Sequence, residues 1–276
     1  MKNSLATWHY PHRSMANNIT YFANHGFPAV SIHGRRLAEA LQRGEGETLA
    51  RAVKESSVTL TVHGTMPRRL DEASVATYHL DLDLIGAWQK TYGLIHILSF
   101  DVPAPVRAHI TPYLQEALLK VPNCYIAVED FGICEEELAQ LEDYRQEPRF
   151  GYLVDVGHMF IRMRGHRDDG KRLFSHAPME SPRVENPTWQ DFKNALLAKD
   201  FPILEMHLHN NDGLRDMHLF LEDGEMDISA VAQALREIDY RGVLTIESAP
   251  GYQFDCYGKD ADEGILRTYG YWKGLF

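Results

Sequence analysis

Eight short apolar runs, separated by segments of helical periodicity, constrain the fold of this 276-residue chain more than any other feature. The runs are Leu5–His9, Ala29–His33, Leu60–His63, Leu94–Phe100, Tyr125–Glu129, Tyr152–Asp155, Ile203–His209 and Val243–Glu247. Between them, apolar residues recur three and four positions apart, as in Val75, Tyr78, Leu82 and Ile85. Consecutive parallel strands need a crossover long enough to hold a helix, so this alternation predicts a parallel α/β sheet. Eight such units favour one (β/α)8 TIM barrel, a single domain over residues 1–276.

A doubly wound open sheet is the alternative architecture. Such a sheet usually carries a glycine-rich phosphate loop after its first strand, and the sequence contains neither GxGxxG nor GxxxxGK[ST]. One long irregular stretch, residues 164–187, is polar and rich in proline and is inserted after the sixth predicted strand. Long loops inside compact domains are usually lids, binding loops or subunit contacts, so we expect one of these roles for the insertion.

Composition excludes several classes of protein. The formal net charge of −11 disfavours a broadly basic surface, which makes nucleic acid an unlikely partner. No stretch of about 18 apolar residues occurs, and the N-terminus (MKNSLATWHYPHR) lacks the apolar core of a secretory signal. Cys124, Cys134 and Cys256 suit neither a disulfide framework nor a metal knuckle. We therefore expect a cytoplasmic protein without a membrane partner. The sequence leaves open whether the chain forms a homo-oligomer.

The polar residues that close the predicted strands indicate where the chemistry lies. In a barrel, the active site lies at the carboxyl ends of the strands. The runs from the fifth to the eighth end in Glu129, Asp155, His207 with His209, and Glu247. Uncompensated buried charges are costly, and a cation removes that cost. The oxygen and nitrogen donors suit a divalent metal, Mn²⁺ or Zn²⁺, with Co²⁺ or Mg²⁺ as alternatives.

Two local patterns support a metal site. Asp155 and His158 (DVGH) leave a strand end three residues apart, so the histidine can face the same cavity as the carboxylate. Asp216 and His218 form a D-x-H pair after the seventh strand. This pair predicts a second metal site or a group that orients the ligands of the first.

The series ED, DxGH, HLHNNDG, RDxH and a terminal ES resembles the xylose isomerase-like TIM-barrel superfamily, which contains sugar isomerases and epimerases and is related to endonuclease IV. In its tagatose/psicose 3-epimerase branch, Glu, Asp, His and Glu of strands five to eight hold the metal. The resemblance implies the metal ligands Glu129, Asp155, His209 and Glu247, with His207 as the alternative to His209. An arginine six residues after the ligand histidine contacts substrate in that branch, and Arg215 has this spacing.

The resemblance implies a divalent-metal-dependent isomerase or epimerase of a small sugar, sugar phosphate or related polyhydroxy carbonyl compound, acting through an enediolate. Glu129 and Glu247 are the expected catalytic pair, one removing the proton and the other returning it. His63, His158 and Arg215 are the expected substrate-binding residues.

Two other reactions on the same scaffold stay open. An endonuclease-IV-like zinc phosphodiesterase would use His63, Asp216 and His218, which match that branch. Its fourth-strand histidine is not matched, because His96 lies too early in the run and Ser99 or Phe100 occupies the strand end. A metal-dependent dehydratase would use the same metal and base but expel a β-hydroxyl group.

Overall fold

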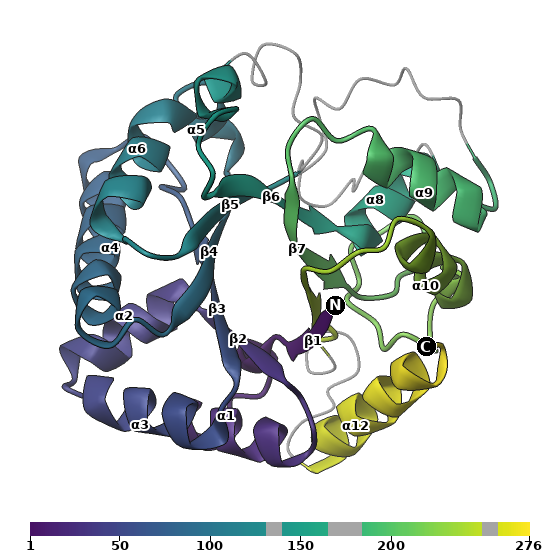
Figure 1. Ribbon diagram of the computed structural model, residues 1–276, viewed down its shortest axis with the longest axis horizontal. Coiled ribbons are helices and arrows are strands. Elements are labelled where there is room, and N and C mark those ends of the chain that lie inside the picture. Colours follow the sequence, from purple (N-terminus) through teal and green to yellow (C-terminus); the bar gives the residue numbers. More distant parts are fainter. Residues whose placement is uncertain (131–139, 165–183, 250–258) are drawn as a thin grey trace.

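A computed structural model describes residues 1–130, 140–164, 184–249 and 259–276. Its eight strands are β1 (Lys2–Leu5), β2 (Ala29–His33), β3 (Thr59–Thr65), β4 (Ile95–Asp101), β5 (Tyr125–Glu129), β6 (Phe150–Asp155), β7 (Ile203–Leu208) and β8 (Val243–Ile246). All paired strands are parallel, in the order β1-β8-β7-β6-β5-β4-β3-β2. A single parallel bridge between Ala6 and Ser31 links β1 to β2 and nearly closes the ring (Figure 1). The predicted α/β barrel is confirmed.

Helices surround this ring of strands (Figure 1). They are α1 (Met15–Asn24), α2 (Gly34–Gln42), α3 (Gly46–Ser56), α4 (Glu72–Tyr92), α5 (Ala104–Arg107), α6 (Ile110–Lys120), α8 (Val156–Met163), α9 (Trp189–Leu197), α10 (Ile228–Glu237) and α12 (Lys259–Gly274), with 3-10 turns η1 (Thr7–His9) and η2 (Glu142–Tyr144). Their ends follow local chemistry. Asp71 and Asp227 cap α4 and α10 by accepting backbone N–H bonds, and Gly93 ends α4 at a φ of 63°.

The first predicted strand is wrong in its position. The sequence favoured Leu5–His9, but β1 ends at Leu5, and Thr7–His9 form η1. The reason is the register with β8, which pairs Lys2–Leu5 with Val243–Ile246 and so recruits the polar start of the chain. The Thr7 hydroxyl then donates a buried 2.9 Å hydrogen bond to the Ser31 carbonyl, which holds the turn against β2.

The barrel has a large outer core and a small inner one. The outer core lies between the strands and the helices. The inner one consists of alternate strand residues, Ala29, Ile97, Ala127, Leu153 and Val243. Two residues further along their strands, Ser99 and Thr245 replace Ile97 and Val243. The barrel interior therefore changes from apolar to polar toward the carboxyl ends of the strands, where the site lies.

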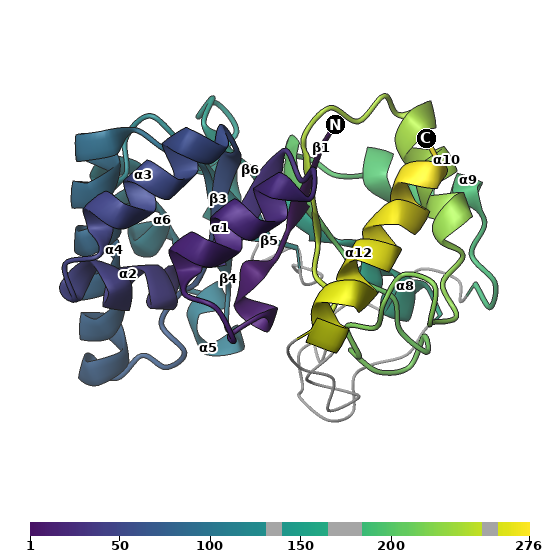
Figure 2. The same ribbon diagram turned by 90° about the horizontal axis from the view of Figure 1, so that it is seen from below.

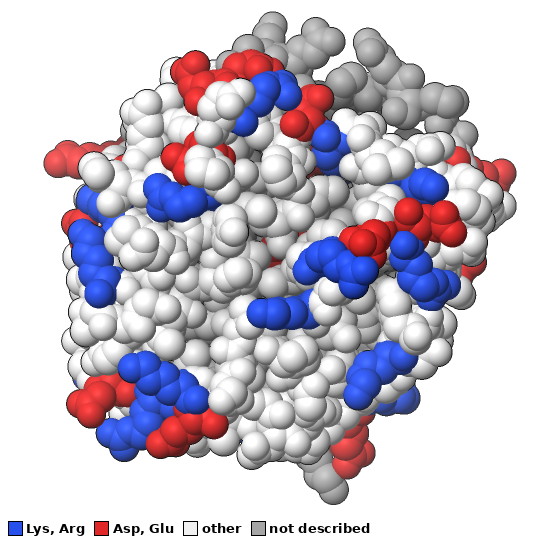
Figure 3. Space-filling view, viewed as in Figure 1, with Lys and Arg blue, Asp and Glu red and all other residues white. Residues whose placement is uncertain are grey.

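The two ends of the barrel differ in what they carry. In Figure 2, β1 descends from the N-terminus, and both marked termini lie on the upper side, so the strands end on the lower side. Figure 3 looks onto the amino-end face, where basic and acidic side chains are interspersed as on an ordinary solvated surface. No helix within the described ranges is long and apolar enough to cross a membrane.

The long insertion follows β6 and α8, as predicted from the sequence. Its residues 165–183 lie outside the described ranges, so the role expected for the stretch 164–187 stays a prediction.

Candidate metal centre

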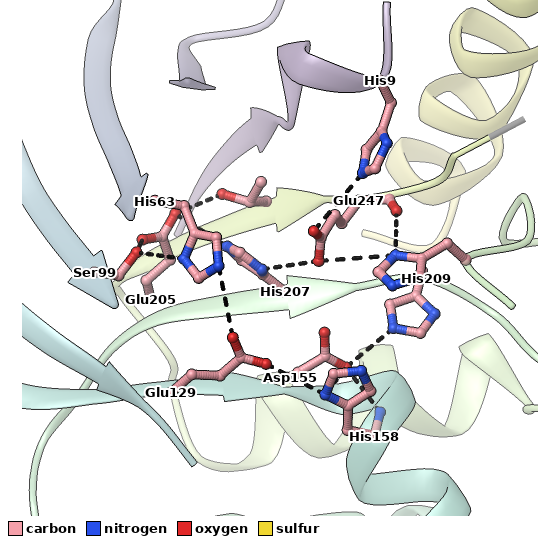
Figure 4. A network of polar contacts seen from close by, with 12 residues as sticks. His9, His63, Ser99, Glu129, Asp155, His158, Glu205, His207, His209 and Glu247 are labelled. Carbon is pink, nitrogen blue, oxygen red and sulfur yellow. Dashed lines mark hydrogen bonds and ion pairs between the residues drawn. The ribbon is translucent and has the colours of Figure 1, made fainter. Parts of the chain in front are cut away.

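The predicted strand-end side chains meet at the carboxyl end of the barrel (Figure 4). Glu129 and Asp155 are the last residues of β5 and β6, and Glu247 follows β8 directly. His207 lies in β7 beside Asp155 in register, and His209 follows the end of this strand. All five side chains are buried, because they point from neighbouring strands into the mouth of the barrel.

The turn from β6 into α8 fixes one part of the site. Asp155 caps α8, with Oδ1 accepting a 2.8 Å hydrogen bond from the His158 backbone N–H. The same oxygen lies 3.2 Å from His209 Nε2. Gly157 makes this approach possible, because a Cβ there would lie 2.3 Å from His209 Cε1 and 2.5 Å from Nε2. The DVGH pattern therefore needs a glycine at position 157, because the His209 ring occupies the space that a Cβ would fill.

Asp216 and His218 complete a second part of the site. The Asp216 carboxylate lies 3.0 Å from His218 Nε2, 3.3 Å from His158 Nε2 and 3.7 Å from His209 Nε2. His218 has a φ of 49°, a region that few residues other than glycine adopt, and its ring stacks on His209 at 3.9 Å. The D-x-H pair predicted from the sequence therefore joins His158 and His209.

Glu247 and Glu129 extend the network to the other strands (Figure 4). Glu247 Oε2 lies 2.9 Å from His207 Nδ1, and its Oε1 lies 3.7 Å from His9 Nε2. Glu129 lies 3.2 Å from His158 Nδ1 and 3.6 Å from His63 Nε2. Carboxylates and imidazoles thus alternate around the mouth.

This alternation controls the pKa values of the site. Burial raises the pKa of Glu129 to about 7. Burial acts to raise the pKa of Glu247 too, but the His207 and His218 imidazoles hold it well below its usual range. Burial acts to lower the pKa of His218, and the Asp216 and Glu247 carboxylates instead bring it to about 10. The site therefore balances its buried charges through pairs of opposite sign.

The donor set fits a divalent cation. Asp155 Oδ2 and His209 Nε2 are buried and make no hydrogen bond among the described residues. Four groups of side chains could each hold an ion, since their ligand atoms lie within 4.8 Å of one another. They are His158, His209, Asp216 and His218; His9, His218 and Glu247; Glu129, Asp155 and His158; and Asp155, His207 and Glu247. Oxygen and imidazole nitrogen together suit Mn²⁺, Zn²⁺ or Co²⁺.

The arrangement separates the two candidate histidines of β7. His207 shares a group with Asp155 and Glu247, whereas His209 shares one with Asp216 and His218. The ligand set Glu129, Asp155, His209 and Glu247 stays a prediction, with His207 still its alternative. The Arg215 side chain is 67% exposed, and its guanidinium bonds Asp212 at 2.7 Å. Its contact with substrate also stays a prediction.

Sequence reasoning missed two polar residues of this region. His9 was placed in the first predicted strand and given no role, but it faces Glu247 from η1. Glu205 was not singled out, although it lies two residues before His207 in β7 and therefore on the same face of the strand. The strand alternation could have found Glu205. Nothing in the local pattern of His9 would have placed it beside β8.

The sequence profile of a family described as "Xylose isomerase-like TIM barrel" matches residues 19–267. The solved structure of D-allulose 3-epimerase from Methylomonas sp., in complex with D-allulose, superposes with a TM-score of 0.67 at 15% identity, covering 100% of this chain and 97% of that chain. A probable 3-DHS dehydratase, AsbF, from Bacillus anthracis superposes with a TM-score of 0.66 at 14% identity, covering 99% of each chain. At such identities, these likenesses concern the fold.

Among curated proteins, an uncharacterized protein of Methanocaldococcus jannaschii is 26% identical over 117 residues. The matched stretch covers 42% of this chain and 32% of that protein, so it spans about a third of the relative's length.

Proposed function

Because this chain belongs to the xylose isomerase-like TIM-barrel family, we propose that it is a divalent-metal-dependent isomerase or epimerase of a small sugar, sugar phosphate or related polyhydroxy carbonyl compound. The observation that carries the proposal is the buried network of carboxylates and imidazoles at the ends of β5 to β8, with Asp155 Oδ2 left without a hydrogen bond among the described side chains. The similarity to a D-allulose 3-epimerase supports a ketose as the first substrate to test.

The proposed ligands are Glu129, Asp155, Glu247 and either His209, which follows β7, or His207 within it. Asp155, His207 and Glu247 form one of the four groups. A bound Mn²⁺ or Zn²⁺, or in their place Co²⁺ or Mg²⁺, would supply Lewis-acid stabilisation of negative charge on the substrate oxygens.

Glu129 and Glu247 are the proposed proton-transfer pair. They extend from β5 and β8, with β6 and β7 between them in the sheet, so they approach a bound substrate from different sides. One carboxylate would remove the proton from the carbon beside the carbonyl, and the other would return one. Return to the opposite face gives an epimer, and return to the neighbouring carbon exchanges aldose and ketose.

The neighbouring histidines orient this pair. His158 lies 3.2 Å from Glu129, and His207 holds Glu247 at 2.9 Å. His63 and His158 would also bind substrate hydroxyls. Arg215 would join them only after leaving Asp212.

The test is turnover of D-allulose and D-fructose with added Mn²⁺ in deuterated water, followed by NMR of the product. Glu247→Gln keeps the shape of the side chain and removes the base, so turnover and deuterium incorporation should fall about 10²–10⁴-fold. Glu237→Gln is the matched control, because Glu237 is a half-exposed residue of α10 that pairs with Lys193. Near-wild-type turnover by Glu247→Gln would sink the assigned role.

A zinc phosphodiesterase is the second candidate, favoured by the group of His158, His209, Asp216 and His218. It predicts two or three retained zinc ions per chain and cleavage of an abasic duplex, whereas the isomerase predicts one exchangeable metal. Against it, position 99 is a serine that bonds His63. A dehydratase, the third reaction, would release water from a β-hydroxy carbonyl compound in the same NMR assay.

A further inference from the structure

Glu205 is a fully buried carboxylate that the proposed reaction does not use. It lies in β7 below the mouth of the barrel, with no exposed surface. Its Oε1 accepts hydrogen bonds from the Thr61 hydroxyl at 2.9 Å and the Thr245 hydroxyl at 2.7 Å. Its Oε2 accepts one from the Ser99 hydroxyl at 3.2 Å (Figure 4). Four strands thus meet at this one side chain.

The hydroxyl groups around Glu205 set the direction of these bonds. Three hydroxyls surround its two carboxylate oxygens, and each of them donates to the carboxylate. The ionised carboxylate has no proton to give, so every hydroxyl that bonds it must donate.

Ser99 passes this direction on to His63. A serine hydroxyl has a single proton, and donating it to Glu205 leaves the Ser99 oxygen only as an acceptor. His63 Nδ1 lies 3.1 Å from that oxygen, so Nδ1 must carry the proton of the bond between them. The other neighbour of the Ser99 hydroxyl, the Val62 carbonyl, is farther away at 3.4 Å and is also only an acceptor. A neutral imidazole has a single N–H, so a proton on Nδ1 leaves Nε2 without one.

We propose that Glu205 is a positioning residue that acts through Ser99 to fix His63 in its Nδ1–H tautomer, which directs an unprotonated Nε2 into the mouth of the barrel. Nε2 lies 3.6 Å from the Glu129 carboxylate, and both are then acceptors, so a substrate hydroxyl that donates or a cation is the partner that suits them. The tautomer is a property of the protein alone, whereas its use in holding substrate rests on the proposed function.

The alternative is a purely structural carboxylate that ties the hydroxyl groups of the barrel interior together. Both roles predict that Glu205→Gln lowers stability. Only the positioning role predicts a change at His63. Two hydroxyls bond Oε1, so the carboxamide of Gln should place its oxygen there and its NH2 group toward Ser99. Ser99 would then accept from Gln and donate to His63 Nδ1, which reverses the tautomer.

The experiment is ¹⁵N NMR of the metal-free, ¹⁵N-histidine-labelled protein at pH 7, with His63→Gln used to assign the signals. The wild type should show His63 with a protonated Nδ1 and an unprotonated Nε2. Glu205→Gln should shift the ring to Nε2–H, and Ser99→Ala should release it into a mixture. Thr245→Val is the matched control, because it removes a hydroxyl from Oε1 and leaves the Ser99 bond to Oε2 in place.

A wild-type His63 protonated at Nε2 overturns the proposal outright. So does an unchanged tautomer in both Glu205→Gln and Ser99→Ala. Should Glu205→Gln fail to fold by circular dichroism, the wild-type tautomer and Ser99→Ala decide the outcome. These measurements need neither metal nor substrate, so they succeed or fail separately from the isomerase assay. If both hold, Glu205→Gln should raise KM more than it lowers kcat.

Discussion

The two sides of the barrel mouth differ in charge although both are buried. On the side of β5 to β8, every strand brings an ionisable group, and carboxylates and imidazoles lie in contact. On the side of β2 to β4, the strands bring His33, His63 and Ser99, and the acidic residue there is Asp101 at the end of β4. Behind β3 and β4 lies a cavity of about 430 Å³ whose lining includes Gly64 and Phe100. The β5 to β8 side therefore holds most of the charged groups, and the β2 to β4 side borders a cavity.

The histidines show what this difference means physically. Burial lowers the pKa of His33 to about 4 and that of His63 to about 3. His218 is as enclosed as His63, but the Asp216 and Glu247 carboxylates raise its pKa to about 10. Desolvation acts on all three rings, and two carboxylates in contact reverse its effect at His218. We therefore expect substitutions on the β5 to β8 side to change metal affinity, and substitutions on the β2 to β4 side to leave it unchanged.

The largest contrast should come from one carboxylate on each side. Asp155→Asn keeps a side chain that can cap α8 but removes the charge, so the affinity for Mn²⁺ or Zn²⁺ should fall by at least about 100-fold. Asp81→Asn removes a carboxylate that pairs with Arg35 beside the cavity and should leave the affinity unchanged. Isothermal titration calorimetry measures both. Equal losses in the two variants would erase the distinction between the sides.

Metal removal should act on the stability of the whole fold. A ligand bound only to the folded state at 100 times its Kd contributes about 2.7 kcal/mol, which corresponds to a Tm shift of roughly 5–10 °C. Differential scanning calorimetry with and without EDTA should show this loss in the wild type and in Asp81→Asn. A shift of the same size in Asp155→Asn would contradict the ligand role of Asp155.

Gly157→Ala tests the site without touching a proposed ligand. Its Cβ would overlap the His209 ring, so we expect about 1–3 kcal/mol of destabilisation and a metal affinity reduced by roughly 10–100-fold. Gly270→Ala in α12 is the control, because a Cβ there meets no atom within 4 Å. Thermal unfolding and metal titration report the two effects. An unchanged metal affinity in Gly157→Ala would mean that the position of His209 does not matter for binding.

The smallest effect should follow the corresponding glycine on the other side. A Cβ at Gly64 would lie 3.3 Å from two carbons of the Phe100 ring, which borders the cavity and has room to move. Gly64→Ala should therefore cost about 1 kcal/mol or less in stability and leave metal affinity as it is. A loss of metal binding in this variant would show that the β2 to β4 side also shapes the ion site.

The sequence predicted the barrel and most of the buried cluster of carboxylates and imidazoles, because both depend on repeated local patterns. An apolar run that closes in a polar residue places Glu129, Asp155 and Glu247 at one edge as soon as the strands are parallel. The predicted position of the first strand was wrong because the register of β1 depends on β8, 241 residues away in the chain. His207 and His209 belong to two different groups of possible ligands. This arrangement depends on the space left by Gly157 and on the left-handed backbone of His218, and apolar periodicity in the sequence predicts neither. Local patterns identify the groups, and only packing decides their partners.

The pairing of β1 with β8 has a consequence for how the molecule forms. Lys2–Leu5 can pair with Val243–Ile246 only after the chain has been synthesised through residue 246, and contacts so distant in sequence are slow to form. Glu247, directly after β8, reaches His207 and His9 in the same late step. The site is therefore completed by the event that closes the barrel, so we expect an incompletely folded chain to lack the proposed base, Glu247, and to be inactive. Activity itself would then serve as a report of complete folding.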